Sequence, residues 1–454
     1  MITAYLAPPD LKNFRLCSQT FSAIGARPLF RKIRFFFHPE ALRWLRYVSE
    51  HPILSKCVRA VWLEADHILW ASCRSMRMPC THDGWRRETL GGIASDIPGL
   101  RQRQLAAWQQ ESLVERWFKD DVSEALARLP LLEEFGFACS ESRGPHFFRP
   151  VLLRAPSHLQ AVKDMRMISH THDPDLLADL FVELLVLCSR TCPKLRFIQS
   201  GPISLLSSVP LLERFNRALK DSCANLTDFC LDFTPEVVQD AALTTSRAAL
   251  QSHTLHRFLK NMPFLRRLSV VLNFVSADAL NWERFGHIDD LFAQHTWSEL
   301  EYLRIGELIG TEEKLLDLYR RHAKTLRHIY IVSMDLGRGG SWFSVFSQMQ
   351  EMLSLESADM KGHFNIVMGD EGFGGDIWMQ MRMWQSDGPN SAKMISFLNH
   401  YLVHDGIFPF RYDSLVNAET VEYAFETEPD LPLRVYDYSS SPGTLGDGIS
   451  DLLA

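Results

Sequence analysis

One group of histidine, cysteine and aspartate residues has the side chains that could bind a metal ion. His170, His172 and Asp173 precede Cys188 and Cys192, and imidazole, thiolate and carboxylate groups are the usual ligands of zinc. The spacing matches no common zinc pattern closely. Asp173 also has a sufficient structural role, because it stands before a proline where a helix begins. We therefore predict no metal site in this group.

Other motifs that carry chemistry are incomplete in this chain. The glycines between 369 and 375 form neither G-x-x-x-x-G-K-[ST] nor a G-x-G-x-x-G that follows a strand, and we expect a surface loop there. Cys73 and Cys80 have no second cysteine pair nearby, and neither G-x-S-x-G nor H-E-x-x-H occurs. The sequence thus predicts no catalytic residues and no cofactor, and we expect that the protein is not an enzyme.

A repeated segment is the main organising feature of the sequence. Residues 265–275 follow the pattern L-x-x-L-x-L-x-x-N-x-L, with Leu268 and Val270 at positions 4 and 6 and Asn273 at position 9. The alternation predicts a short strand whose positions 4 and 6 point into a core. Asn273 is expected to satisfy backbone groups where the chain turns away from that strand.

The same pattern recurs along the chain with predicted helices between the copies. Its first positions are residues 195, 226, 265, 300, 326 and 355. Residues 58–68 also fit it, with Asp66 in the Asn place, and residues 132–137 repeat its strand core. Leucine-rich repeats commonly span about 20–29 residues. Here the spacing is longer and uneven, as expected if a full helix and loops separate the strands.

Two α/β folds can place strands and helices in this alternation. In a doubly wound sheet the central strands are buried on both faces and form continuous apolar runs. These strands instead alternate polar and apolar residues, as in Ile329-Tyr-Ile331. We therefore expect an irregular leucine-rich-repeat solenoid arc with one open face, and a doubly wound α/β enzyme is the alternative.

An open concave face would present the residues next to positions 4 and 6. Aromatic and arginine side chains, which are enriched at interface hot spots, occur among them. We predict a partner-binding face made of Phe197, Gln199, Asp228, Arg267, Ser269, Tyr302, Arg304, His328, Tyr330 and Asp359.

The N-terminal 36 residues predict a short amphipathic helix, because apolar residues between Leu11 and Ile24 recur every three or four positions. Leu6, Pro9-Asp10-Leu11, Phe14, Leu16-Cys17-Ser18 and Phe21 resemble the second half of an F-box. The run Ala26-Arg27-Pro28-Leu29-Phe30-Arg31-Lys32-Ile33 is similar to the end of that motif in fungal F-box proteins. The family's opening Leu-Pro segment and most of its first helix do not precede Leu6, so part of the family's binding surface is expected to be missing.

The resemblance implies a small helical segment that binds the Skp-type adaptor of a cullin–RING ubiquitin ligase. The matching positions would be adaptor-binding residues, namely Leu6, Pro9, Leu11, Phe14, Leu16 and Phe21. In that family the rest of the chain holds the substrate. The resemblance therefore implies a non-catalytic substrate receptor, and a leucine-rich-repeat scaffold without a ubiquitin link is the alternative.

Composition and charge are ordinary for a globular protein. The 454 residues carry a formal net charge of −7, which gives no reason to expect nucleic acid as a partner. Nine cysteines at scattered spacings predict a reducing cytoplasmic or nuclear location, with a mitochondrial transit peptide as the alternative. No apolar run approaches the roughly 20 residues of a membrane span.

These features predict five regions. They are a partial F-box-like helical segment (1–36), an N-terminal part of the repeat region with insertions (37–192), a solenoid (193–368), a C-terminal cap (369–435) and an acidic flexible tail (436–454).

Overall fold

The computed structural model of the chain describes ten groups of residues, namely 13, 16–36, 39–64, 117–138, 174–234, 248–272, 286–338, 342–367, 378–382 and 398–404. The chain divides into two compact units, Met1–Ile203 and Ser204–Ala454. No helix among these residues is long and apolar enough to cross a membrane.

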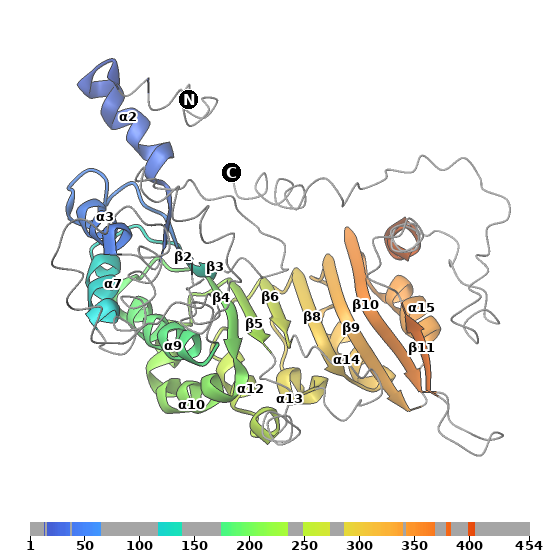
Figure 1. The fold of residues 1–454 in the computed structure, drawn as a ribbon. Coiled ribbons are helices and arrows are strands. Elements are labelled where there is room, and N and C mark those ends of the chain that lie inside the picture. Colours follow the sequence, from blue (N-terminus) through green and yellow to red (C-terminus); the bar gives the residue numbers. More distant parts are fainter. Residues whose placement is uncertain are drawn as a thin grey trace, which may run out of the picture. The chain divides into compact units, whose positions relative to one another are not determined.

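The first unit is built from parallel strands and the helices that connect them (Figure 1). Its elements in chain order are α2 (Gln19–Phe30), β1 (Lys32–Phe36), α3 (Pro39–Glu50), β2 (Ala60–Glu64), α7 (Trp117–Ala127), β3 (Glu134–Ala138), α9 (Pro174–Thr191) and β4 (Phe197–Ser204). Strands β1 to β4 pair in that order. Helix α7 packs between α3 and α9, so the three form one layer.

The second unit continues the same alternation and adds an antiparallel strand. Its elements are α10 (Leu205–Ser222), β5 (Asp228–Thr234), α12 (Thr254–Leu259), β6 (Arg267–Val271), β7 (Gly286–His287), α13 (Ile288–Phe292), β8 (Tyr302–Ile309), α14 (Glu312–His322), β9 (His328–Arg338), α15 (Trp342–Met352), β10 (Ser357–Val367) and β11 (Trp378–Arg382). The pairing order is β5-β6-β8-β9-β10-β11, with the short β7 beside β8. Strand β11 is antiparallel to β10 and the other pairs are parallel.

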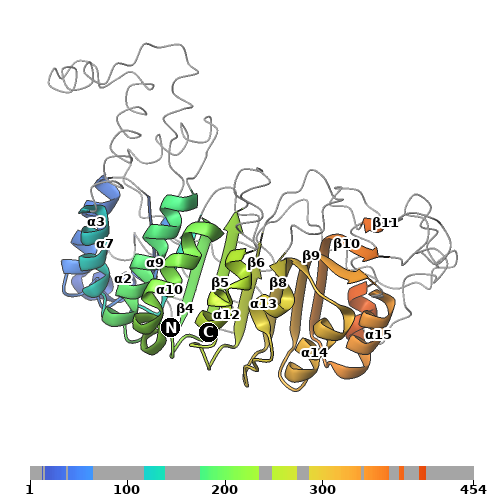
Figure 2. The same ribbon diagram turned by 90° about the horizontal axis from the view of Figure 1, so that it is seen from below.

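The helices of the second unit form a single layer. Each of α10, α12, α13, α14 and α15 contacts the next in that order, and Figure 2 shows them side by side over the strands. The described strands of this unit also have no reversal in their order. The crevice at which a doubly wound sheet binds its ligand arises where strand order reverses, so these strands do not form one.

The predicted fold, an F-box-like helical segment followed by a solenoid arc, is wrong, although the α/β class is correct. In each unit the described strands pair side by side in an extended sheet, in the order β1-β2-β3-β4 in the first unit and β5-β6-β8-β9-β10-β11 in the second. Two strands are also longer than the short repeat strands predicted, since β9 and β10 have 11 residues each. A strand-and-helix alternation is common to both architectures, and the repeat pattern alone did not distinguish them.

The N-terminal segment contributes a strand to that sheet. Strand β1 lies within the predicted helical segment 1–36 and pairs with β2 along its whole length, from Lys32 opposite Ala60 to Phe36 opposite Glu64. The alternation of Lys32 and Arg34 with the buried Ile33 and Phe35 is a strand signal. Strand β1 begins two residues after the end of α2, so the predicted helical segment 1–36 included it.

Apolar side chains between sheet and helices form the core of the second unit. Leu268 and Val270, predicted to point inward, are fully buried. Phe229 on β5 makes an edge contact with Phe258 on α12, with ring centres 5.4 Å apart. Helices α14 and α15 lie between successive copies of the repeat, where the sequence predicted helices. Asn273 lies outside the described residues.

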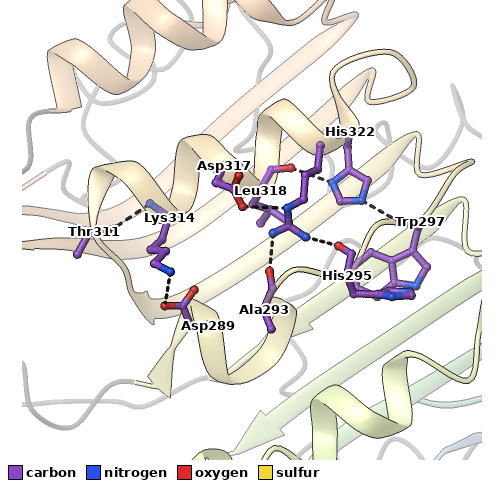
Figure 3. A network of polar contacts seen from close by, with 10 residues as sticks. Asp289, Ala293, His295, Trp297, Thr311, Lys314, Asp317, Leu318 and His322 are labelled. Atoms are coloured by element: carbon purple, nitrogen blue, oxygen red, sulfur yellow. Dashed lines mark hydrogen bonds and ion pairs between the residues drawn. The ribbon is translucent and has the colours of Figure 1, made fainter.

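A polar network attaches α14 to the turn that follows α13 (Figure 3). Arg321 donates to the carbonyl oxygens of Ala293, at 2.6 Å, and His295, and it pairs with Asp317 at 3.0 Å. Ala293 has a positive φ of 33° and follows the last turn of α13. Arg321 therefore satisfies carbonyl groups at the end of a short helix, where the backbone leaves them unpaired.

Candidate interaction surface

Two rows of side chains cross the strands of the second unit at the predicted positions. The first row is Asp228, Arg267, Tyr302, His328 and Ser357, and the second row is Cys230, Ser269, Arg304, Tyr330 and Asp359. In each row every residue stands directly opposite the next on the neighbouring strand. Equivalent positions of successive repeats are therefore paired across these strands.

Both rows lie on the sheet face opposite the helices. Phe229, between Asp228 and Cys230, contacts Phe258 of α12, and neighbouring residues of a strand point to opposite faces. We call the two rows together the two-row surface. It joins five strands, β5, β6, β8, β9 and β10, so its geometry depends on the pairing of all five.

The two-row surface is less exposed than an open sheet face was expected to be. Asp228 is 8% exposed, Ser269 is 5% exposed and Arg304 is 6% exposed. Cys230 is buried as well. Arg267, Tyr302, His328, Tyr330 and Asp359 are half-buried. Solvent therefore reaches this surface mainly at the half-buried side chains.

Ionic and hydrogen-bonded contacts order the first row. The Arg267 Nε donates to Asp228 Oδ1, and the Thr227 hydroxyl donates to Asp228 Oδ2 at 2.6 Å. His328 Nδ1 is 2.9 Å from Ser357 Oγ, and its Nε2 is 3.7 Å from Glu356. Burial lowers the pKa of His328, against the opposing charges of Glu356 and Glu301. The row thus contains a neutral imidazole and a charge-compensated arginine at pH 7.

The second row contains a buried thiol and a buried guanidinium. Burial raises the pKa of Cys230, and the positive charge of Arg304 partly opposes that rise. The Arg304 Cζ lies 5.2 Å from the ring centre of Tyr330, within the range of a cation–π contact. Burial also raises the pKa of Tyr330 and of Tyr302 above the usual tyrosine value. A nucleophilic cysteine needs a lowered pKa, so Cys230 is not activated for catalysis.

The remaining predicted partner-binding residues belong to the first unit. Phe197 and Gln199 on β4 are half-buried. The Phe197 ring packs 5.7 Å from that of Trp62, and the Gln199 Oε1 atom is buried without a hydrogen-bond partner in the described part of the chain. Phe197 is therefore at least partly a packing residue.

Two of the predicted adaptor-binding residues are described, and both are exposed. Leu16, which precedes α2, is 85% exposed, and on α2 Phe21 is 41% exposed and Ile24 is 45% exposed. Ser18 caps α2 by accepting a hydrogen bond from the Phe21 N–H. Leu6, Pro9, Leu11 and Phe14 lie outside the described residues. An apolar strip on a surface helix is typical of a binding site when it is contiguous.

The candidate metal ligands can be placed only in part. Cys188 on α9 and Cys192, the residue that directly follows this helix, are both buried. The hydrogen bond with Cys192 and burial raise the pKa of Cys188 well above its usual value. His170, His172, Asp173, Cys73, Cys80 and the glycines 369–375 are outside the described residues. Within the described ranges no three His, Cys, Asp or Glu side chains are grouped to hold a metal ion.

Comparison with known proteins adds no relative. The chain matches no protein-family model, and it matches no curated protein sequence. A functional proposal therefore depends on the residues themselves.

Proposed function

We propose that the protein is a non-catalytic substrate receptor of a cullin–RING ubiquitin ligase. The N-terminal helical residues would bind the Skp-type adaptor, and the two-row surface would bind a target protein. The observation that carries the proposal is the exposure of Leu16, Phe21 and Ile24. Two of these, Leu16 and Phe21, are positions at which the sequence resembles an F-box.

The contribution of such a receptor is positional. Holding the target beside the ligase raises the effective concentration of its lysine side chains near the activated ubiquitin. The polar, aromatic and arginine side chains of the two-row surface are types that recur at protein interfaces. This role also fits a cytoplasmic or nuclear location, which the unpaired cysteines favour, including the buried Cys57 and Cys223.

The alternative is an interaction scaffold without a ubiquitin link. One observation favours it. Strand β1 follows α2 directly and is part of the sheet, whereas the F-box of the family is a separate helical module. In this alternative the exposed residues of α2 would bind a partner other than the adaptor.

Size-exclusion chromatography of the purified chain with a purified Skp-type adaptor separates the two functions. The receptor function predicts a shared peak at a mass equal to the sum of both proteins. Separate elution at micromolar concentrations of both, with an adaptor that forms a complex with a known F-box protein in parallel, would leave the scaffold as the better account.

A further inference from the structure

We propose that His400 and His404 form a binding site for a divalent transition-metal ion, with both imidazole rings as ligands. The two histidines lie four positions apart in a helix of residues 398–404, which Figure 1 shows in red beside α15. The inference goes beyond the proposed function, because neither adaptor binding nor target binding requires a metal ion. Neutral imidazole is the commonest protein ligand of such ions, and Zn²⁺, Ni²⁺ and Cu²⁺ are the ions that it suits.

The packing of this helix leaves both imidazoles on the side away from the core. Leu398, Tyr401 and Leu402 are buried, and their spacing places them together on one side of the helix. The spacing of His400 and His404 places both on the other side, where His400 is half-buried and His404 is exposed. An ion in solution can therefore reach the two rings.

Hydrogen bonds fix the backbone that carries the two histidines. The Asn399 Oδ1 accepts from the backbone N–H of Ala358, on β10, at 3.2 Å. The Tyr401 carbonyl oxygen accepts from the side-chain amide of Gln350, on α15, at 3.2 Å, and the Tyr401 hydroxyl donates to Ser347 Oγ at 3.4 Å. The metal ligands thus stand on an anchored helix, which lowers the conformational entropy that is lost when both bind one ion.

The two rings are already close to the geometry of a shared ion. Their centres lie 5.3 Å apart, and their planes are tilted by 45°. Two imidazoles on one tetrahedral ion, with metal–nitrogen distances of about 2.1 Å, would have ring centres roughly 5 Å apart. Histidines at positions i and i+4 on one helix face are also a recurrent way to bind zinc. Small side-chain rotations would therefore be enough to bring one nitrogen of each ring to the same ion.

The ligand set decides which ions the site would take. Mg²⁺ and Ca²⁺ require oxygen ligands, so two imidazoles select against them. Among the later transition metals, Cu²⁺ should bind most tightly and Ni²⁺ and Zn²⁺ less so. Within the described residues no third His, Cys, Asp or Glu side chain is grouped with this pair. The bound ion would therefore keep coordination positions for water or for a side chain of another molecule.

Ni²⁺ titration of the full chain, followed by NMR of the histidine ring signals, tests the site. A site-specific signal is needed because the chain has 17 histidines and nine cysteines. The signals missing from the His400→Asn and His404→Asn variants identify the two rings. Ni²⁺ is paramagnetic and broadens the signals of rings that bind it. We expect both signals to broaden together with one dissociation constant, and Mg²⁺ at the same concentrations should leave them unchanged.

Each single variant should weaken Ni²⁺ binding at the remaining ring by roughly tenfold or more, because the chelate is lost. His253→Asn is the matched control, since His253 is an exposed histidine of the same unit and Asn tolerates its positive φ of 56°. This variant should keep the wild-type affinity at His400 and His404. Circular dichroism verifies that each variant is folded. Broadening of the two signals at different Ni²⁺ concentrations, or an unchanged affinity at His400 in His404→Asn, would overturn the metal site.

Discussion

The imidazole of His322 accepts a hydrogen bond from the backbone N–H of Trp297 at 3.0 Å, and the two rings stack 5.9 Å apart (Figure 3). The other ring nitrogen, Nδ1, lies 2.8 Å from the Leu318 carbonyl oxygen, to which it donates. This pair of hydrogen bonds requires a neutral imidazole, because a protonated ring has no acceptor. Burial lowers the pKa of His322 accordingly.

Acid should destabilise the protein through His322 and its neighbour His295. Burial, with Lys260 nearby, lowers the pKa of His295 to about 4. Below about pH 6.5 the unfolded chain binds protons at these histidines and the folded chain does not. Stability is therefore complete above about pH 6.5 and should fall as the pH decreases toward 4. Urea unfolding at several pH values, monitored by circular dichroism, measures the decline.

His322→Gln isolates the contribution of this imidazole. The variant should be less stable at pH 7 by about 1–3 kcal/mol, because the buried N–H of Trp297 loses its partner. It should also lose less stability between pH 7 and pH 5 than the wild-type chain. His404→Gln, at an exposed histidine, is the control. An unchanged pH dependence in His322→Gln would refute the assignment.

Arg321→Met should destabilise the second unit by about 1–3 kcal/mol, because the carbonyl groups of Ala293 and His295 lose their donor. Arg320→Met changes the neighbouring, exposed arginine and should cost less than about 0.5 kcal/mol. Urea midpoints of the two variants give the comparison. Equal midpoints would show that the network adds little to stability.

Gly306 on β8 is required by close packing between strands. A Cβ atom there would lie 2.9 Å from Val271 Cγ1 and 3.2 Å from Val332 Cβ. Gly306→Ala should therefore cost about 1–3 kcal/mol. The double variant Gly306→Ala with Val271→Ala should be more stable than the sum of the two single effects, since the shortened valine makes room. Strict additivity in thermal unfolding would mean that the clash is relieved elsewhere.

The repeats align with the strand register, but the sequence did not predict the architecture. Arg267 lies opposite Tyr302 and Ser269 opposite Arg304, which are equivalent positions of successive repeats. Strand length depends on pairing partners that a single repeat does not contain, and the pattern underestimated β9 and β10. The prediction of a solenoid arc depended on the repeat motif alone. An extended parallel sheet contains the same motif, so the motif does not distinguish the two folds.

The sequence also did not predict that the side chains of the two-row surface are buried. Alternation predicted which side of each strand Arg304 occupies, but exposure depends on residues distant in the chain. The His322–Trp297 hydrogen bond joins residues 25 positions apart, and neither residue stands in a motif. An Arg321-His322 pair at the end of an amphipathic helix is a weak signal, because basic residues are common in last turns.

The affinity of the chain for a purified Skp-type adaptor, measured by isothermal titration calorimetry, tests the central claim most directly. The receptor function predicts saturable binding that Leu16→Asp weakens by roughly tenfold or more. Ile53→Asp, at another exposed apolar residue of the first unit, should leave the affinity unchanged. Absence of binding by the wild-type chain, or equal affinities for Leu16→Asp and the wild type, would contradict the account.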